Sequence, residues 1–90
     1  MSILIDRPLV SAHGRMWSHL VSDSSFEELH EFAARAGLPR RGFDADHYDV
    51  PAELYDALVA AGAVPVRSRD LVESLVRSGL RRRKRPAPRR

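Results

Sequence analysis

The chain has 90 residues, of which 43% are hydrophobic and 30% are charged, as in an ordinary globular protein. This length supports one small domain with a modest core. The chain has no cysteine, which excludes disulfide bonds and thiolate metal sites. No apolar run approaches the roughly 20 residues that span a bilayer, and the first residues lack a signal-peptide pattern. We therefore expect a cytoplasmic protein without membrane contact.

Positive charge is concentrated at the C-terminal end. Residues 81–90 carry seven of the 15 lysine and arginine residues, whereas all 12 acidic residues precede them. The sequence predicts one compact domain over residues 1–80 and a disordered basic tail over residues 81–90. Such a tail attracts phosphates without reading bases, so nucleic acid is a predicted partner. The alternative is a solubilising tail rich in arginine through compositional drift. The residues assigned to nucleic-acid contact are Arg81, Arg82, Arg83, Lys84 and Arg85.

The first 21 residues predict two strands. Residues 3–5 form a continuous apolar run, typical of a strand buried on both faces. Pro8 soon follows and cannot donate to a β-ladder, so residues 7–16 are predicted mainly as loop. Residues 17–21 predict the second strand. The connection is short for a parallel crossover, which leaves an antiparallel pairing open.

A helix beginning near residues 23–25 is the clearest element. Ser24 with Glu27, or Ser25 with Glu28, makes a capping box in which the hydroxyl and the carboxylate bond to backbone amides. Apolar residues then recur at helical spacing. Gly37 suits the left-handed position that follows a helix.

The rest of the chain alternates further strands and helices. The expected elements are a loop over residues 40–46, a weak strand over residues 48–50, a helix from Pro51 to Gly62, a strand over residues 63–66 and a last helix that Ser68 caps. This order predicts an α/β fold in which a small sheet of three to four short strands is packed by about three helices. The order is strand, strand, helix, a weak strand, helix, strand, helix. Because the chain is small, a homodimer through one helix face is a further partner to test.

Polar residues that can carry chemistry gather in residues 44–49. This stretch holds three aspartates and a histidine, more than a loop requires. Asp6 follows a buried strand, the position where ligands bind in open α/β sheets. His13 and His19 flank Trp17 in the sequence. Carboxylates and imidazoles are ligands for divalent metals such as Mn, Mg or Zn.

Two function hypotheses follow. The first is a divalent-metal-dependent hydrolase acting on phosphate esters or nucleic acid. Its metal ligands would be Asp6, Asp46, His47 and His19, and its catalytic residues His47, Asp46 and His13. The second is a non-catalytic binding module that holds nucleic acid with the tail. Structural roles remain open as well, because aspartates between elements often form turns or caps. On that interpretation His30 and Trp17 belong to the core.

Several runs of residues together resemble a known family. They are Ile-Leu-Ile-Asp at residues 3–6, Ala-His-Gly-Arg-Met-Trp-Ser-His-Leu at 12–20, Ser-Asp at 22–23, Glu-Leu-His-Glu-Phe-Ala at 28–33, Asp-His-Tyr-Asp-Val-Pro at 46–51 and Ser-Gly-Leu-Arg at 78–81. In combination they are similar to the domain of unknown function 4031 family, small bacterial and phage proteins without an assigned activity. The resemblance reaches about Arg83. It implies the extent of the domain and no reaction.

Overall fold

The computed structural model describes residues 2–81. In chain order its elements are β1 (Ile3–Ile5), β2 (Val10–Ala12), β3 (Arg15–Ser22), α1 (Phe26–Arg35), the 3-10 helix η1 (Arg40–Gly42), β4 (Phe43–Asp44), β5 (His47–Pro51), the 3-10 helix η2 (Ala52–Leu54), α2 (Tyr55–Ala60), β6 (Val64–Pro65) and α3 (Ser68–Arg77). The predicted α/β class and the approximate order of elements are confirmed. Two short strands, β2 and β4, lie where loops were predicted.

The strands form one mixed sheet in the order β4-β5-β3-β1-β6, and β2 also pairs with β3. β1 pairs antiparallel with β3 and parallel with β6. This antiparallel pairing places Asp6 and Asp23 at opposite ends of β1. The Asp23 carboxylate accepts a hydrogen bond from the Ser2 amide at 2.7 Å, whereas the Asp6 amide donates to the His19 carbonyl at 3.2 Å.

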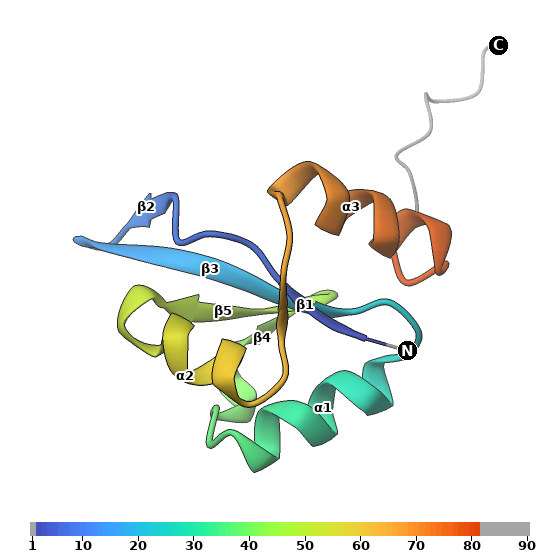
Figure 1. Ribbon diagram of the computed structural model, residues 1–90, viewed down its shortest axis with the longest axis horizontal. Coiled ribbons are helices and arrows are strands. Elements are labelled where there is room, and N and C mark those ends of the chain that lie inside the picture. The colour runs from blue at the N-terminus through green and yellow to red at the C-terminus, as the bar shows by residue number, and fades with distance from the viewer. Residues whose placement is uncertain (1, 82–90) are drawn as a thin grey trace, which may run out of the picture.

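Helices cover both faces of the sheet, with α3 on one side and α1 and α2 on the other (Figure 1). The larger core lies under α1 and α2 and includes Ile5, Leu20 and Tyr48. The smaller core joins Leu71 and Leu75 of α3 to one end of β1 and β3. Side chains alternate between faces along a strand, so His19 and Val21 share the face that α3 partly covers. No helix within residues 2–81 has the length and apolar character that crossing a membrane requires.

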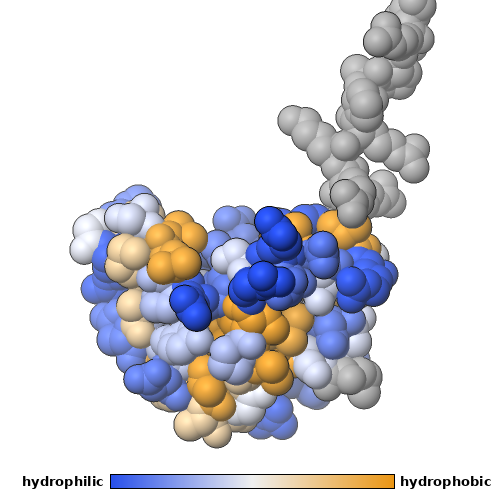
Figure 2. Space-filling view, turned by 45° about the horizontal axis from the view of Figure 1, so that its top comes forward, coloured by the Kyte–Doolittle hydropathy of each residue, from blue (hydrophilic) through white to orange (hydrophobic). Residues whose placement is uncertain are grey.

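Part of the segment predicted as loop, residues 7–16, is a β-hairpin. Ala12 pairs with Arg15, so the turn consists of His13 and Gly14 alone, with φ angles of 52° and 76°. Two successive positive φ angles define a type I′ turn, whose twist matches that of the flanking strands. β3 therefore begins two residues earlier than predicted. The hairpin exposes apolar side chains such as Leu9 and Met16, and Figure 2 shows orange surface at the left, where Figure 1 places β2.

Only one of the two hydrogen bonds of the predicted capping box forms at the start of α1. The Ser25 hydroxyl accepts from the Glu28 amide at 3.1 Å, which is one half of the capping box. The Glu28 carboxylate does not return to the cap amide. It accepts instead from the hydroxyls of Ser22 and Ser24, and the Ser25 amide donates to the Ser22 hydroxyl at 3.1 Å. The buried hydroxyl of Ser22 thus replaces the carboxylate as the acceptor.

The other predicted helix starts are also shifted. Pro51 precedes η2 rather than an α-helix, and α2 begins at Tyr55. Ser68 is the first residue of α3 and does not cap it. Its hydroxyl donates to the Asp6 carboxylate at 2.7 Å, and a hydrogen bond to an ionised acceptor is stronger than a neutral one.

Candidate metal centre

His19, His47 and Asp49 form a cluster on the face of the sheet that α3 partly covers. In the register of β3 with β5, His19 lies opposite Asp49. His47 is two residues from Asp49 on β5, so the three side chains share one face. The rings of His19 and His47 meet edge to face, with centroids 5.1 Å apart. One ring nitrogen from each histidine and one carboxylate oxygen of Asp49 lie within 4.8 Å of one another.

These separations suit ligands of a single metal ion. The Nε2 atom of His47 lies 3.2 Å from Oδ1 of Asp49. Two ligands held at about 2.0–2.1 Å in a tetrahedral site are roughly 3.3 Å apart, so this pair needs almost no movement. His19 would close on the ion by a small shift of its ring. Three protein ligands leave a fourth position for water or substrate.

Asp6 fixes the orientation of His19. Its carboxylate, buried in the fold, lies 3.0 Å from Nδ1 of His19 and accepts from the backbone amide of the same residue at 2.7 Å. The carboxylate thus takes the place of a strand carbonyl at the point where β1 ends. Since Nδ1 faces Asp6, Nε2 is the nitrogen of His19 that is available to a metal.

Asp46 has the same relationship to His47. It is 6% exposed, and its carboxylate lies 2.8 Å from Nδ1 of His47. Arg81 donates to the same carboxylate through Nε at 2.7 Å and Nη2 at 2.9 Å. Each histidine is therefore backed by a buried carboxylate, the arrangement that commonly orients metal-binding histidines.

The contacts of these groups set their pKa values. Burial raises the pKa of Asp6, but hydrogen bonds from His19 and Ser68 outweigh burial and hold it below its ordinary value. The bond to Asp6 raises the pKa of His19, against the opposing effect of burial. The bond from Arg81 lowers the pKa of Asp46. Both carboxylates are thus ionised near neutral pH and can each hold a proton on the facing Nδ1.

Residues 3–78 match a family model described as protein of unknown function (DUF4031). The match covers most of the chain and includes every residue of the cluster. The chain belongs to this family. The resemblance recognised in the sequence is therefore confirmed. No curated protein and no solved structure matches the chain significantly. The DUF4031 family thus identifies the domain, and its activity has to be inferred from the site.

The DUF4031 domain brings some of the predicted site residues together and separates others. His19 and His47 converge, whereas Asp6 and Asp46 each contact a histidine from behind. His13 is exposed in the turn of the β2–β3 hairpin, away from the cluster. Asp49 was absent from the predicted ligands. The alternation of a strand through residues 47–51 was the signal that could have placed it beside His47.

Arg81 was predicted as the first residue of the basic tail. In the structure its guanidinium is bound to the buried Asp46 carboxylate, so this residue contributes to the folded domain. The remaining residues assigned to nucleic-acid contact, 82–85, lie outside the described residues. Their role stays a prediction.

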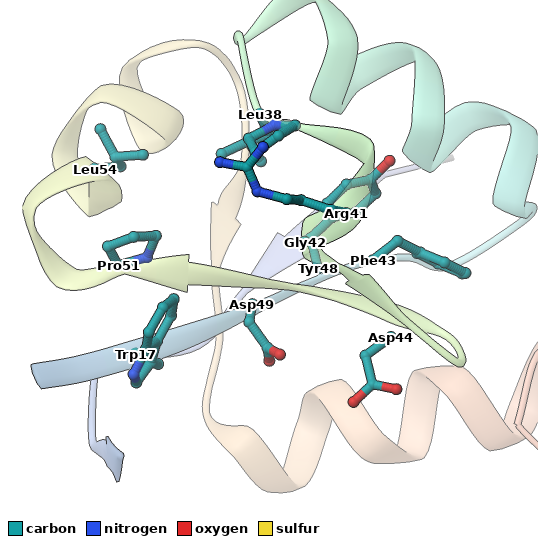
Figure 3. A pocket seen from close by; sticks show the side chains of 11 residues that line it. Trp17, Leu38, Arg41, Gly42, Phe43, Asp44, Tyr48, Asp49, Pro51 and Leu54 are labelled. Atoms are coloured by element: carbon teal, nitrogen blue, oxygen red, sulfur yellow. The ribbon is translucent and has the colours of Figure 1, made fainter. Parts of the chain in front are cut away.

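A pocket of about 560 Å³ adjoins the cluster (Figure 3). Asp49 belongs to both, and Trp17 forms part of the pocket wall. The expectation that Trp17 is a core residue was therefore wrong. Its side chain is partly buried, and in Figure 1 β3 extends past the helices at this end. His30 was expected to be a packed core histidine, and it is packed against Phe43 and Tyr48.

Proposed function

We propose that this DUF4031 protein binds one divalent metal ion through His19, His47 and Asp49 and uses it to hydrolyse phosphate esters. The observation that carries the proposal is the pair of buried carboxylates behind the two histidines. Burying a carboxylate is unfavourable unless it is paired. Supporting carboxylates orient metal-binding histidines and increase their basicity. This role would explain why both the Asp6 and the Asp46 carboxylates are buried beside a histidine.

The proposed ligand set indicates the kind of metal. Two imidazoles and one carboxylate suit Zn²⁺, Mn²⁺ and similar transition metals, whereas Mg²⁺ and Ca²⁺ favour oxygen ligands alone. We therefore expect Zn²⁺ or Mn²⁺ to bind more tightly than Mg²⁺. The proposal gives Asp6 and Asp46 a supporting role in place of the direct ligation inferred from the sequence.

A metal with an open position supplies a more acidic water and polarises a phosphoryl oxygen. Hydrolysis adds the oxygen of water to phosphorus and breaks the ester P–O bond, and the released alcohol takes up a proton. Asp6 raises the pKa of His19, and the positive charge of Arg81 opposes this rise with a smaller effect, as expected of a guanidinium near the cluster. In this proposal the Arg81 guanidinium, while bound to Asp46, would help to stabilise the charge of the phosphate during the reaction.

Metal binding is tested first on the full chain after removal of metals by a chelator. The protein is titrated with Zn²⁺, Mn²⁺ and Mg²⁺ by calorimetry and thermal melting. We expect one ion per chain and, at about 100 times Kd, a rise in Tm on the order of 10–20 °C. His19→Ala, His47→Ala and Asp49→Asn should abolish this rise. His13→Ala is the matched control and should show the same metal-dependent rise in Tm as the native chain.

Hydrolysis is tested next with 4-nitrophenyl phosphate and bis(4-nitrophenyl) phosphate. Metal-dependent release of nitrophenol that the ligand variants lose would support the proposal. Binding of metal without turnover of either ester would contradict its enzymatic part. If none of the three metals bound, the centre itself would be refuted.

A second proposal concerns nucleic acid and rests on the separation of charge in the sequence. An acidic domain precedes a strongly basic end, and blocks of like charge are often interaction tails. Fluorescence anisotropy with duplex DNA would compare the full chain with a chain that ends at Arg81. The full chain should bind with a log–log salt slope of at most about −5, as expected for six phosphate contacts. Equal binding by the shortened chain would contradict the proposal.

A further inference from the structure

The pocket beside the cluster has the dimensions of a small-molecule site. Its volume of about 560 Å³ lies within the range of roughly 300–1,000 Å³ that is common for ligand pockets. Asp49 lines this pocket and also belongs to the cluster with His19 and His47. Of the three cluster residues only Asp49 is in the pocket lining, and its backbone carbonyl faces Gly42 there.

Trp17 gives one end of this pocket a fixed, flat surface. Its Nε1 atom donates to the Ala12 carbonyl at 2.9 Å, and the Arg15 guanidinium lies 5.8 Å from the ring centroid. The indole N–H is thus already satisfied, and the ring is held in place. Pro51 pairs with Trp17 across the sheet, and Leu54 lies at the same end in Figure 3. This end suits a flat apolar ring, which can stack on the indole.

Arg41 adds positive charge to the same pocket. In Figure 3 it lies between the Trp17 end and the Phe43 end, on the opposite side of β5 from the Asp49 carboxylate. Within residues 2–81 no carboxylate forms an ion pair with the Arg41 guanidinium. A guanidinium in a pocket is well suited to phosphate, which it can bind through two parallel hydrogen bonds.

We infer that this pocket binds a phosphate ester of a flat aromatic compound. The ring lies against Trp17, and the phosphate lies at the Arg41 guanidinium. Nucleotides and simple aryl phosphates share this chemistry. Binding in the pocket depends on Trp17 and Arg41 and not on the metal, so this inference and the proposed function can fail separately.

The test uses the intrinsic fluorescence of Trp17, which is the one tryptophan in the chain. Full-length protein freed of metal is titrated with adenosine 5′-monophosphate, adenosine, phenyl phosphate and ribose 5-phosphate. We expect saturable quenching by the first compound and binding about tenfold weaker or worse for adenosine, which lacks the phosphate. Ribose 5-phosphate, which lacks the ring, should not quench. Phenyl phosphate shows whether any aryl phosphate suffices or the nucleotide is preferred.

Two neighbouring arginines give a matched pair of variants. Arg41→Gln should remove the tenfold preference for the phosphorylated compound, whereas Arg40→Gln should keep it. Arg40 lies over the Phe43 ring and does not line the pocket. Both residues are exposed, so neither variant should unfold. Leu54→Glu, which places a negative charge in the lining, should weaken the nucleotide and phenyl phosphate alike.

The outcomes separate this inference from the proposed function. Absence of quenching by both ring-bearing phosphates, or equal quenching by ribose 5-phosphate, would overturn the inference even if metal binds. An identical loss in Arg40→Gln and Arg41→Gln would overturn the assignment of the phosphate to Arg41. Quenching that responds to Arg41 in a protein unable to bind metal would support the pocket while refuting the metal centre.

Discussion

The Nδ1 atom of His19 lies 3.0 Å from the Oδ2 atom of Asp6, a carboxylate that is 1% exposed. The same oxygen accepts the hydroxyl of Ser68 at 2.7 Å. Asp6 therefore joins the end of β1 to β3 and to the first turn of α3. Asp6 and Ser68 are 62 positions apart in the sequence. The carboxylate that orients His19 is therefore itself held by a long-range contact of the fold.

The first prediction concerns the role of Asp6 in metal affinity. Asp6→Asn keeps the size of the side chain and can still accept from the His19 backbone amide, but it loses the negative charge that faces Nδ1. We expect a folded protein whose metal affinity is about 10–100 times weaker, the usual effect of removing such a supporting carboxylate. Calorimetric titration with Zn²⁺ would measure this loss.

Asp23→Asn is the matched control, because Asp23 binds Ser2 at the opposite end of β1. It can change stability, but it should leave the metal affinity of the folded protein unchanged. A loss of metal affinity of the same size in both variants would show that the effect is a general disturbance of the fold and not the loss of support for His19. Native affinity in Asp6→Asn would remove the supporting role of Asp6.

The second prediction concerns the ion pair between Arg81 and Asp46. Arg81→Met would leave the buried Asp46 carboxylate without its cation, and we expect a loss of roughly 1–2 kcal/mol in the free energy of unfolding at pH 7. The exposure of Arg81 keeps this figure below that of a fully buried pair. Urea unfolding of the full chain would measure it.

The pH dependence of this loss has a definite sign. Arg81 lowers the pKa of Asp46 below its ordinary value of 3.8, so the stabilisation is complete above that pH and disappears as the pH falls through the lowered pKa. Native and variant proteins should therefore differ most near neutrality and converge in acid. A chain that ends at Arg82 should match the native stability, whereas one that ends at Leu80 should match Arg81→Met. Equal stability of the two shortened chains would contradict this role of Arg81.

Local signals in the sequence were sufficient for the layout of the fold. The apolar run at residues 3–5 gave a strand buried on both faces, and Gly37 ended α1 with a φ angle of 82°. Turn chemistry was harder to read. Histidine adopts positive φ less readily than asparagine, so the two-residue turn at His13 and Gly14 resembled a loop.

The candidate site depended on information that local patterns do not hold. Asp6 and Ser68 are brought together by the parallel pairing of β1 with β6, which no spacing in the sequence encodes. Ser68 was taken as a helix cap because a serine near a helix start usually is one. Arg81 was assigned to the tail by composition, although its charge is used by Asp46. Only His47 and Asp49 were close enough in the sequence to be paired by strand alternation.

The third prediction tests whether His13 has a catalytic or a structural role. His13→Asn places a residue that tolerates positive φ in the type I′ turn, so we expect a gain of about 0.5 kcal/mol in stability. His13→Val should lose about 1–2 kcal/mol, because a β-branched residue is strained in that conformation. Thermal melts would show both effects. If His13→Asn weakened metal binding or ester hydrolysis, the catalytic role predicted from the sequence would be restored.

The last prediction concerns His30, whose Nδ1 atom lies 2.8 Å from the Tyr48 hydroxyl. Burial and the nearby charge of Arg40 lower the pKa of His30 below 6.5. The folded protein thus resists a proton that the unfolded chain accepts, so His30 makes the protein lose stability as the pH falls below 6.5.

His30→Gln keeps a partner for the Tyr48 hydroxyl and does not titrate. Between pH 7.5 and pH 5, its melting temperature should therefore fall less than that of the native protein. His19 acts in the opposite direction, because its pKa is raised, but it is present in both proteins and drops out of the comparison. Parallel curves for the two proteins would mean that His30 takes up a proton as readily in the fold as in the unfolded chain. The packing of His30 against Phe43 and Tyr48 would then carry no electrostatic penalty.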